Sequence, residues 1–343
     1  MGLAALAVLI GLVVLVWSAG IFIGGATILA KKLRVPSFLI GLIILGLGSS
    51  APEMVVSVMA ALQGSPELAL GNAYGSNIIN IALVLGATAI ISPIIIHKSI
   101  VKRELPILVL VTALAAWQLR DGLLSQTDGA LLLGGLVVVL GIQIMLSLCE
   151  NSLEHKNNES ESDLVKNDVV IDTHYDSKDS KVQAATETSL ANGMGSLFIG
   201  MFMLILSSQA IVWGAVELAT LWGLSELIIG LTIVSIGTSL PELVASLAAA
   251  RRGEHDMALG NIIGSNIFNT LGVVGLAALI APITANPMIL SRDILMIGVL
   301  TLLLFVLCIF AFLSKRRFGR ASGIVLVLCF VGYTLWLMQT INL

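Results

Sequence analysis

The chain has 343 residues and a net charge of -3, and it is 57% hydrophobic and 11% charged, with a mean hydropathy of +1.02. A soluble globular domain carries about 25% charged residues, so this composition excludes one and predicts a chain that lies in a lipid bilayer. Residues 149–192 contain ten Asp or Glu and four Lys, so the negative net charge belongs to one segment and says nothing about a substrate.

Ten apolar runs have about the length of a membrane-spanning helix, which needs about 20 residues. The first run follows no basic segment, so we expect a first span there and not a cleaved signal peptide. The sequence predicts an all-α membrane protein with ten transmembrane helices, near Leu3–Ala30, Ser37–Leu62, Leu68–Ile91, Leu105–Leu119, Asp128–Leu148, Met194–Leu221, Ser225–Ala250, Met257–Ile280, Ile289–Leu313 and Ser322–Ile341.

An apolar stretch with a polar centre, Gly41–Gly86, returns 189 residues later as Gly230–Gly275, with 23 of 46 positions identical and no gap. The chain is therefore a duplication with five predicted spans in each copy, over residues 1–148 and 193–343. Because five is an odd number, the second copy enters the membrane from the opposite side. The sequence predicts two inverted five-helix repeats, an architecture shared by many secondary transporters.

The distribution of Lys and Arg predicts the orientation, because short cytoplasmic loops are enriched in these residues. Only Arg120 and Arg292 fall in the loops on the side of the two termini, so we expect both termini outside. The opposite loops hold Lys31, Lys32, Arg34, Lys98, Lys102, Arg103, Arg251, Arg252, Lys315, Arg316, Arg317 and Arg320.

Residues 149–192, on the predicted cytoplasmic side, are rich in Glu, Asp, Asn, Ser and Lys and have almost no apolar periodicity. This composition is typical of a solvated, partly disordered linker between two halves. A regulatory cation sensor is the alternative because carboxylates cluster there, although the ligand order of an EF-hand is missing from the sequence.

Each copy of the repeat carries a proline and a glutamate in the middle of an apolar span, Pro52–Glu53 and Pro241–Glu242. Proline removes a helical donor, so we expect the carbonyls of Gly48 and Gly237 to lack helical partners and to face a desolvated cation. The alternative is an ordinary proline kink that nearby hydroxyls satisfy. An ionised side chain at mid-membrane costs about 2.5–3.5 kcal/mol, and its recurrence in both copies favours a functional role. The nearby hydroxyls belong to Ser49, Ser50, Thr238 and Ser239.

The third and eighth spans each place three polar side chains at i, i+4 and i+8, close to one helix face. The pairs Gly71–Gly75 and Gly260–Gly264, with GxxxG spacing, allow neighbouring helices to approach closely. Asn77 and Asn266 lie off this face, so we expect them to form hydrogen bonds between helices. The polar face consists of Asn72, Ser76, Asn80, Asn261, Ser265 and Asn269.

Together these residues predict a cavity with two carboxylates, hydroxyls, amide oxygens and loosened carbonyls, and without imidazole or thiolate. Such an all-oxygen set suits hard cations, above all Ca²⁺, which takes 6 to 8 oxygen ligands. Two carboxylates neutralise one Ca²⁺, and they could equally hold Na⁺ ions.

The motifs resemble the two alpha-repeats of the cation/calcium exchanger superfamily, and the chain is most similar to its prokaryotic sodium/calcium exchanger branch. The resemblance rests on GSSAPE at 48–53, GN at 71–72 and GSNIIN at 75–80, echoed by GTSLPE at 237–242 and GSNIFN at 264–269. It covers all ten spans and leaves out only the central loop.

The resemblance implies antiport of Na⁺ and Ca²⁺, commonly three Na⁺ per Ca²⁺, through one site exposed alternately to each side of a plasma (inner) membrane. We expect no cofactor, and the first and sixth spans would be the moving gates. Some relatives have an Asp at the position of Asn269, so this site has one carboxylate fewer. The implied ion ligands are Glu53, Glu242, Ser49, Ser50, Ser76, Asn80, Thr238, Ser239, Ser265 and Asn269, with the carbonyls of Gly46 and Ser235 nearby.

Three other classes of protein are alternatives. A membrane enzyme would need a catalytic motif, but the sequence has neither H-E-x-x-H nor G-x-S-x-G, and its four histidines fall in loops. A cation channel would also use carboxylates and carbonyls, but the inverted duplication favours alternating access. A proton-coupled Ca²⁺ exchanger is the main alternative, because glutamates can carry protons. We expect no nucleic-acid partner, and the sequence leaves the oligomeric state open.

Overall fold

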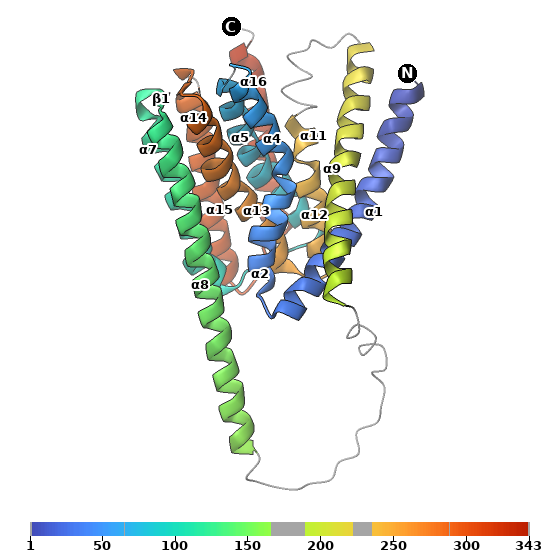
Figure 1. Cartoon of the computed structure of the whole chain (residues 1–343), viewed down its shortest axis with the longest axis vertical. Coiled ribbons are helices and arrows are strands. Elements are labelled where there is room, and N and C mark those ends of the chain that lie inside the picture. Colours follow the sequence, from blue (N-terminus) through green and yellow to red (C-terminus); the bar gives the residue numbers. More distant parts are fainter. Residues whose placement is uncertain (1, 65, 166–188, 222–234, 288, 342–343) are drawn as a thin grey trace.

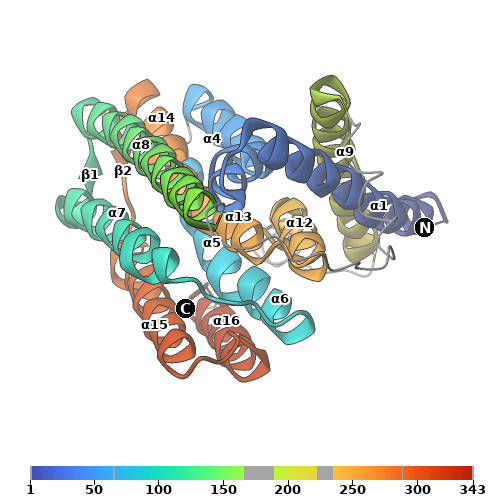
Figure 2. The same cartoon turned by 90° about the horizontal axis from the view of Figure 1, so that it is seen from below.

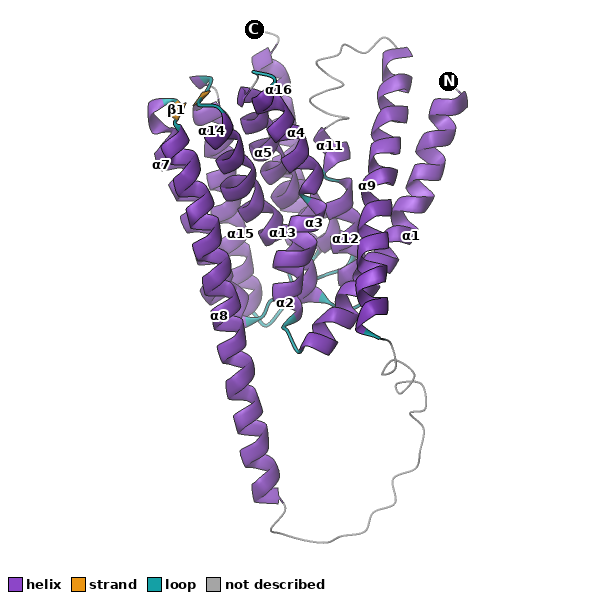
Figure 3. Ribbon diagram, in the orientation of Figure 1, coloured by secondary structure: helices purple, strands orange, loops and turns teal. Residues whose placement is uncertain are grey.

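The computed structural model describes residues 2–64, 66–165, 189–221, 235–287 and 289–341, and almost all of them are helical (Figure 3). The elements of the first half are α1 (Gly2–Leu33), α2 (Ser37–Leu39), η1 (Ile40–Leu45), α3 (Gly46–Ser49), α4 (Ala51–Leu62), α5 (Pro66–Ile79), η2 (Asn80–Leu85), α6 (Gly86–Ile91), η3 (Ile100–Glu104), α7 (Leu105–Gln118), η4 (Leu119–Asp121), β1 (Leu123–Leu124) and α8 (Gln126–Val165).

The second half contains the same kinds of element. They are α9 (Leu190–Leu221), α11 (Ser235–Thr238), α12 (Leu240–Arg251), α13 (His255–Ile267), η7 (Phe268–Val273), α14 (Val274–Ile280), β2 (Ile283–Thr284), η8 (Ile289–Ile294), α15 (Leu295–Leu313) and α16 (Arg320–Ile341).

Seven helices in the described part of the chain are long and apolar enough to cross a membrane, and a bent pair makes an eighth. The bent pair is Ser37–Ser49 with Ala51–Leu62, which meet at 44°. These helices confirm the predicted class of all-α membrane protein. Two of the ten predicted spans are not among the eight: α7 has only 14 residues, and the span near Ser225–Ala250 begins in residues 222–234, outside the described part. The count of ten therefore stays a prediction.

Several elements of the two halves begin at the same offset of 189 residues as the sequence repeat. In both halves a π-helical segment lies within the third or the eighth predicted span, as η2 and η7. The equivalent starts are Ala51 and Leu240, Pro66 and His255, and Ile100 and Ile289.

The helices form a bundle in which α1 and α9 lie side by side at one edge (Figures 1 and 2). The helices α7, α8, α15 and α16 lie at the opposite edge, and α5, α12 and α13 lie between the two groups. The start of α1 and the end of α16 lie at the same end of the bundle (Figure 1). Of the helices that carry the duplicated motif, α5, α12 and α13 thus lie inside the bundle, whereas α4 lies at its edge (Figure 2).

Two short backbone pairings join the halves of the chain. Strand β1 pairs with β2 in antiparallel register, with Leu124 opposite Ile283. An isolated bridge joins Ile94 to Phe318 through hydrogen bonds of 2.9 and 2.8 Å. Ile94 and Ile283 are equivalent residues of the repeat, so each half supplies the partner that the other half needs.

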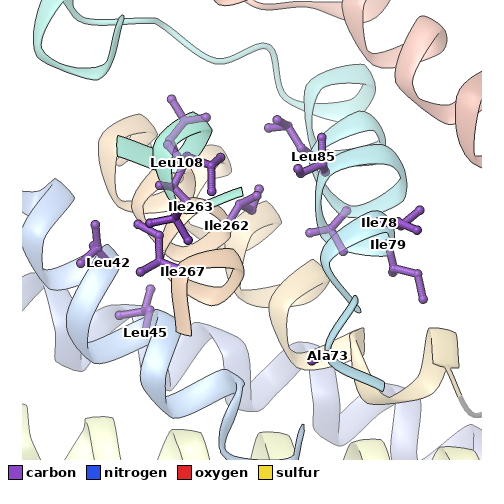
Figure 4. Packing of buried hydrophobic residues seen from close by; sticks show 14 of the residues in the cluster. Leu42, Leu45, Ala73, Ile78, Ile79, Leu85, Leu108, Ile262, Ile263 and Ile267 are labelled. Carbon is purple, nitrogen blue, oxygen red and sulfur yellow. The ribbon is translucent and has the colours of Figure 1, made fainter. Parts of the chain in front are cut away.

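The first part of the bent pair, Ser37–Ser49, crosses α13 so closely that the two backbones are in contact. A Cβ added at Gly264 would lie 2.9 Å from the Cα of Leu42, and one added at Gly41 would lie 2.9 Å from the Cα of Met257. Leu42 and Leu45 then pack beside Ile263 and Ile267 (Figure 4). The close approach predicted for Gly260–Gly264 is confirmed, whereas a Cβ at Gly71 or Gly75 would meet no atom of the described residues within 4 Å.

Helix α8 differs from the predicted boundary of the first repeat at Leu148, because it continues as helix to Val165. The added residues contain no Gly or Pro and include four Glu, two Leu and one Lys, which are good helix formers. Extending an existing helix needs no new nucleus, so a polar sequence can prolong an apolar span. The rest of the predicted linker, residues 166–188, lies outside the described part.

Candidate cation site

Both proline motifs break their helices at the same residue of the repeat. Ser50 has φ -84° and ψ 3° between α3 and α4, and Ser239 has φ -90° and ψ 5° between α11 and α12. Pro52 and Pro241 follow in the first turn of the new helix, where a missing donor is tolerated. Each proline motif therefore lies at a helix break, which places Glu53 and Glu242 in the first turn of α4 and α12.

The two glutamates are completely buried, each with 0% exposure. Neither oxygen of Glu53 accepts a hydrogen bond from the described residues, and Oε2 of Glu242 also has no partner among them. The positive end of each helix dipole lies at these carboxylates. A buried carboxylate with few protein donors is neutralised by a proton or by a bound cation, so these two side chains could hold a cation.

Two buried amides complete the set on the third and eighth predicted spans. Asn80 and Asn269 are 0% exposed, and their side chains have no hydrogen-bond partner within the described part of the chain. Asn80 begins the π-helical segment η2, and Asn269 lies at the second residue of η7. Such π-helical turns within α-helices often occur at functional sites, and the sequence analysis did not predict them.

Side chains of the first repeat contact the motif of the second repeat directly. The Ser49 hydroxyl donates to Oδ1 of Asn261 at 3.2 Å and lies 3.4 Å from the hydroxyl of Ser265. The Ser50 hydroxyl donates to Oε1 of Glu242 at 3.4 Å. The structure thus brings the two copies of the motif together at one place, as the sequence predicted.

A pair of equivalent amides holds the first turns of α4 and α12. Nδ2 of Asn72 donates to the Glu53 carbonyl at 3.3 Å and to the Ser57 hydroxyl at 3.1 Å. Nδ2 of Asn261 donates in the same way to the Glu242 carbonyl at 3.3 Å and to Ser246 at 2.8 Å. Asn72 and Asn261 therefore position the glutamates. The sequence analysis missed Ser57 and Ser246, although their identity in both copies was a usable signal.

The expectation of free carbonyls at the breaks is wrong for the second repeat. There the Gly237 carbonyl accepts a hydrogen bond of 2.7 Å from the hydroxyl of Ser208 on α9. In the first repeat, the N–H of Ser50 contacts the Gly48 carbonyl. The Gly46 carbonyl accepts from the N–H of Ser50 at 3.2 Å and from the Ser265 hydroxyl at 3.4 Å. In the second repeat, the donor that Pro241 removes is therefore replaced by a side chain from another helix.

The remaining predicted residues are Ser76, Thr238, Ser239 and Ser235. Ser76 and Ser239 are buried, and the Ser239 hydroxyl has no partner among the described residues. Thr238 lines a cavity of about 400 Å³ between α4 and α9, together with Pro52 and Ser208. Ser235 is the first residue of α11, and its side chain lies outside the described part.

Asn77 and Asn266 were expected to form hydrogen bonds between helices, and the expectation holds for one of them. Nδ2 of Asn77 donates to the hydroxyl of Thr270 at 2.8 Å, which joins the two halves. Nδ2 of Asn266 donates instead to the carbonyl of Ile262, one turn back in its own helix.

The arrangement supplies six buried oxygens without a hydrogen-bond partner in the described part of the chain, from Glu53, Glu242, Asn80, Asn269 and Ser239. Six is the lower end of the coordination number of Ca²⁺. The described residues hold no group of three or more His, Cys, Asp or Glu side chains that could bind a metal. A cation bound here would therefore depend on two carboxylates and on neutral amide and hydroxyl oxygens.

A family model described as sodium/calcium exchanger protein matches residues 3–145 and 192–339, one stretch in each half. The putative antiporter CaxA of Alkalimonas amylolytica is 43% identical over 333 residues, which cover 96% of this chain and 97% of that protein. The inner membrane protein YrbG of Escherichia coli is 36% identical over 338 residues, which cover 98% of this chain and 96% of that protein.

A solved structure has a closely similar fold. It is the sodium-calcium exchanger NCX_Mj soaked with zero Na⁺ and Ca²⁺, which matches with a TM-score of 0.77 and 30% sequence identity. The match covers 96% of this chain and 97% of that chain. The similarity thus extends over both halves and is not confined to the motifs.

Proposed function

Because the chain belongs to the sodium/calcium exchanger protein family, we propose that it is a secondary active antiporter that exchanges Na⁺ for Ca²⁺. The family consists of ion transporters and not of enzymes, and the apolar helices make the chain a membrane protein. The observation that carries the proposal is the pair of buried glutamates, Glu53 and Glu242, at equivalent helix breaks.

The proposed architecture has ten transmembrane helices in two inverted five-helix repeats. Its support is the matching order of elements at an offset of 189 residues and the reciprocal pairing of β1 with β2 and of Ile94 with Phe318. We place both termini outside and residues 149–192 in the cytoplasm of the cell that bears this plasma (inner) membrane protein. The bias of Lys and Arg toward one set of loops supports this orientation.

The proposed ion ligands are the carboxylates of Glu53 and Glu242 with the side-chain oxygens of Asn80, Asn269 and Ser239. Ser49, Ser50, Ser76, Thr238 and Ser265 and the carbonyls of Gly46 and Ser235 complete the surrounding shell. The two carboxylates would neutralise one Ca²⁺. Na⁺ ions would bind the same carboxylates together with the neutral amide and hydroxyl oxygens. The same charged groups then serve either ion in turn, which is the requirement for exchange at one site.

The proposed stoichiometry is three Na⁺ per Ca²⁺, with α1 and α9 as the elements that move against the rest. Their position at one edge of the bundle (Figure 2) and the pairing of α1 with α9 support this division. Three single charges against one double charge move one net positive charge in each cycle.

Ca²⁺ uptake into proteoliposomes tests the function. With Na⁺ inside and none outside, we expect rapid Ca²⁺ uptake, because Na⁺ leaving the vesicle drives Ca²⁺ inward through the shared site. With a pH gradient of similar size and no Na⁺, we expect the rate of Ca²⁺ uptake to be no higher than the rate in vesicles without protein. Uptake is measured with radioactive Ca²⁺ at clamped membrane potential.

The same assay separates the alternatives. Uptake driven by the pH gradient alone would identify a proton-coupled exchanger, in which the glutamates carry H⁺ instead of Na⁺. Ca²⁺ entry that needs no counter-ion on the other side would identify a channel. Either result would overturn the proposed coupling.

Potassium is expected to be unnecessary for this exchange. Asn80 and Asn269 are both neutral amides, so Glu53 and Glu242 carry the formal negative charge among the proposed ligands. An additional buried monovalent cation needs further negative charge, which this set does not provide. Replacing K⁺ with choline on both sides, at constant membrane potential, should leave the rate of Na⁺-driven Ca²⁺ uptake unchanged. A strict requirement for K⁺ would show that another group supplies the missing charge.

A further inference from the structure

One buried hydrogen bond joins the proposed gate helix α9 to the ion-binding motif of the second repeat. The Ser208 hydroxyl donates to the Gly237 carbonyl at 2.7 Å, and Ser208 is only 4% exposed. Gly237 lies in α11, directly before Thr238 and Ser239 of the proposed ion shell. The bond therefore connects an element that is proposed to move with the backbone that carries ion ligands.

Gly237 allows α9 to approach α11 closely enough for this bond. A Cβ at Gly237 would clash with the side chain of Val212, which follows Ser208 by four residues on α9. Residues four positions apart lie on one face of a helix, so Ser208 and Val212 both face α11. The contact between the two helices is thus close along a full turn of α9.

The first repeat forms its helix break without an equivalent bond. The residue equivalent to Ser208 is Ala19 on α1, which is buried and has no hydroxyl. The carbonyl equivalent to that of Gly237 belongs to Gly48, where a Cβ would lie 2.6 Å from Sδ of Met201 on α9. The repeat motif can therefore break its helix without a serine on the neighbouring helix, so the fold alone does not explain Ser208.

A hydrogen bond between two elements that move against each other exists in only one of their arrangements. Hydroxyl-to-carbonyl bonds span about 2.5–3.0 Å, so a shift of α9 along α11 by more than about 1 Å breaks this one. A cavity of about 400 Å³, lined by Ser208, Thr238 and Pro52 among others, lies beside the bond and gives space for such a shift. A buried hydrogen bond of this kind changes an equilibrium about fivefold, and here it favours the arrangement in which α9 contacts α11.

We propose that Ser208 is a positioning residue for the transport cycle, whose hydroxyl holds α9 against the second ion-binding motif in one of the two alternating states. The inference rests on the proposed function, in which α1 and α9 move against the other helices. Removing the hydroxyl shifts the ratio of the two states and leaves every proposed ion ligand in place. The change therefore concerns how often the site faces each side of the membrane.

Ca²⁺ self-exchange in vesicles of known orientation tests this role. The vesicles are loaded with saturating unlabelled Ca²⁺, and the KM for external radioactive Ca²⁺ is measured in right-side-out and in inside-out preparations. In an obligatory exchanger, each KM depends on how much of the loaded protein faces the opposite side, so the ratio of the two KM values varies with the ratio of the two states. Ser208→Ala is expected to change this ratio about fivefold.

Ser207→Ala is the matched control, because Ser207 is the buried neighbour whose hydroxyl donates to the carbonyls of Met203 and Leu204 within α9. It removes a hydroxyl from the same turn without a bond to α11, so the ratio should equal that of the wild type. Ser208→Thr keeps a hydroxyl and should give a ratio closer to the wild-type value than Ser208→Ala does. A general loss of Ca²⁺ affinity changes both KM values by the same factor. An unchanged ratio in Ser208→Ala, or an equal change in Ser207→Ala, would overturn the proposal.

Hydrogen exchange of the purified full chain tests the same bond without transport. Mass spectrometry follows the backbone amides of residues 236–240 in the absence of Na⁺ and Ca²⁺. Ser208→Ala should speed their exchange about fivefold, because the arrangement without the α9 contact is populated more often, whereas Ser207→Ala should leave the rate unchanged. Equal rates in the wild type and Ser208→Ala would contradict the role of the bond. Failure of the Na⁺-driven uptake would leave this measurement unaffected.

Discussion

Replacing Glu53 or Glu242 with glutamine is expected to abolish Na⁺-driven Ca²⁺ uptake. The two carboxylates are fully buried, and each supplies half of the charge that a divalent cation requires. Removing one leaves the ion unbalanced in a medium of low dielectric, where breaking a buried charge pair costs about 3–5 kcal/mol. A loss of about 3 kcal/mol already weakens binding about a hundredfold. The measurement is the initial rate of radioactive Ca²⁺ uptake in proteoliposomes for each single variant.

The structure also makes this test specific to ion binding. Both oxygens of Glu53 lack a hydrogen bond from the described residues, so glutamine removes charge without breaking a bond that holds the fold. Glu67→Gln is the matched control, because Glu67 lies exposed in the first turn of α5 and its oxygen accepts from the Asn286 N–H. The control should transport normally. Near-native exchange in both site variants, with normal insertion, would disprove the assignment.

Replacing Gly264 with valine is expected to disrupt the core of the bundle. A Cβ at this position would lie 2.9 Å from both the Cα and the carbonyl carbon of Leu42, so the clash is with backbone and a change of rotamer cannot relieve it. Overpacking of this kind costs about 3 kcal/mol or more when the surroundings cannot move. The helices would have to separate beside Ser265, which contacts the Gly46 carbonyl. Thermal unfolding of the purified protein should show a clear fall in melting temperature, together with lost Ca²⁺ binding.

Gly134→Val is the control for the helix propensity of valine. Gly134 lies exposed on α8, and a Cβ there would meet no atom of the described residues within 4 Å. Both substitutions change the intrinsic helix propensity by the same amount, so the difference between their melting temperatures reports the crossing alone. Equal melting temperatures for the two variants would show that the α13 crossing is looser than the structure indicates. The additional change Leu42→Ala should not rescue Gly264→Val, because the clash is with the backbone of that residue.

The sequence predicted the membrane class, the family and the meeting of the two motifs, because these depend on local signals that occur twice. A proline beside a glutamate in an apolar span indicates a helix break next to a carboxylate. This signal is local and does not depend on which helices pack around it. The break residues, Ser50 and Ser239, have nearly equal backbone angles, as expected for copies of one motif. The family match over both halves confirms the resemblance that rested on the same residues.

The features that the sequence did not predict depend on tertiary contacts. Ser208 lies in the apolar α9, and nothing in its neighbours indicates that it bonds to the Gly237 carbonyl. The π-helical segments η2 and η7 change the helix for only six residues each, too few to alter an apolar periodicity. Asn77 and Asn266 are equivalent in the repeat but differ in their partners. Asn77 bonds to Thr270 of the other half, whereas the equivalent residue of the first half is Ile81, which has no hydroxyl.

The reciprocal backbone pairing of the two halves also constrains how the protein is made. Leu124 finds its partner only when Ile283 has been synthesised, and Ile94 must wait for Phe318 near the end of the chain. Contacts between residues so distant in sequence form late, because the intervening loop must be closed first. The first half therefore leaves the ribosome before the partners of its backbone groups at these points exist. The two halves can complete this pairing only after the second half has been synthesised.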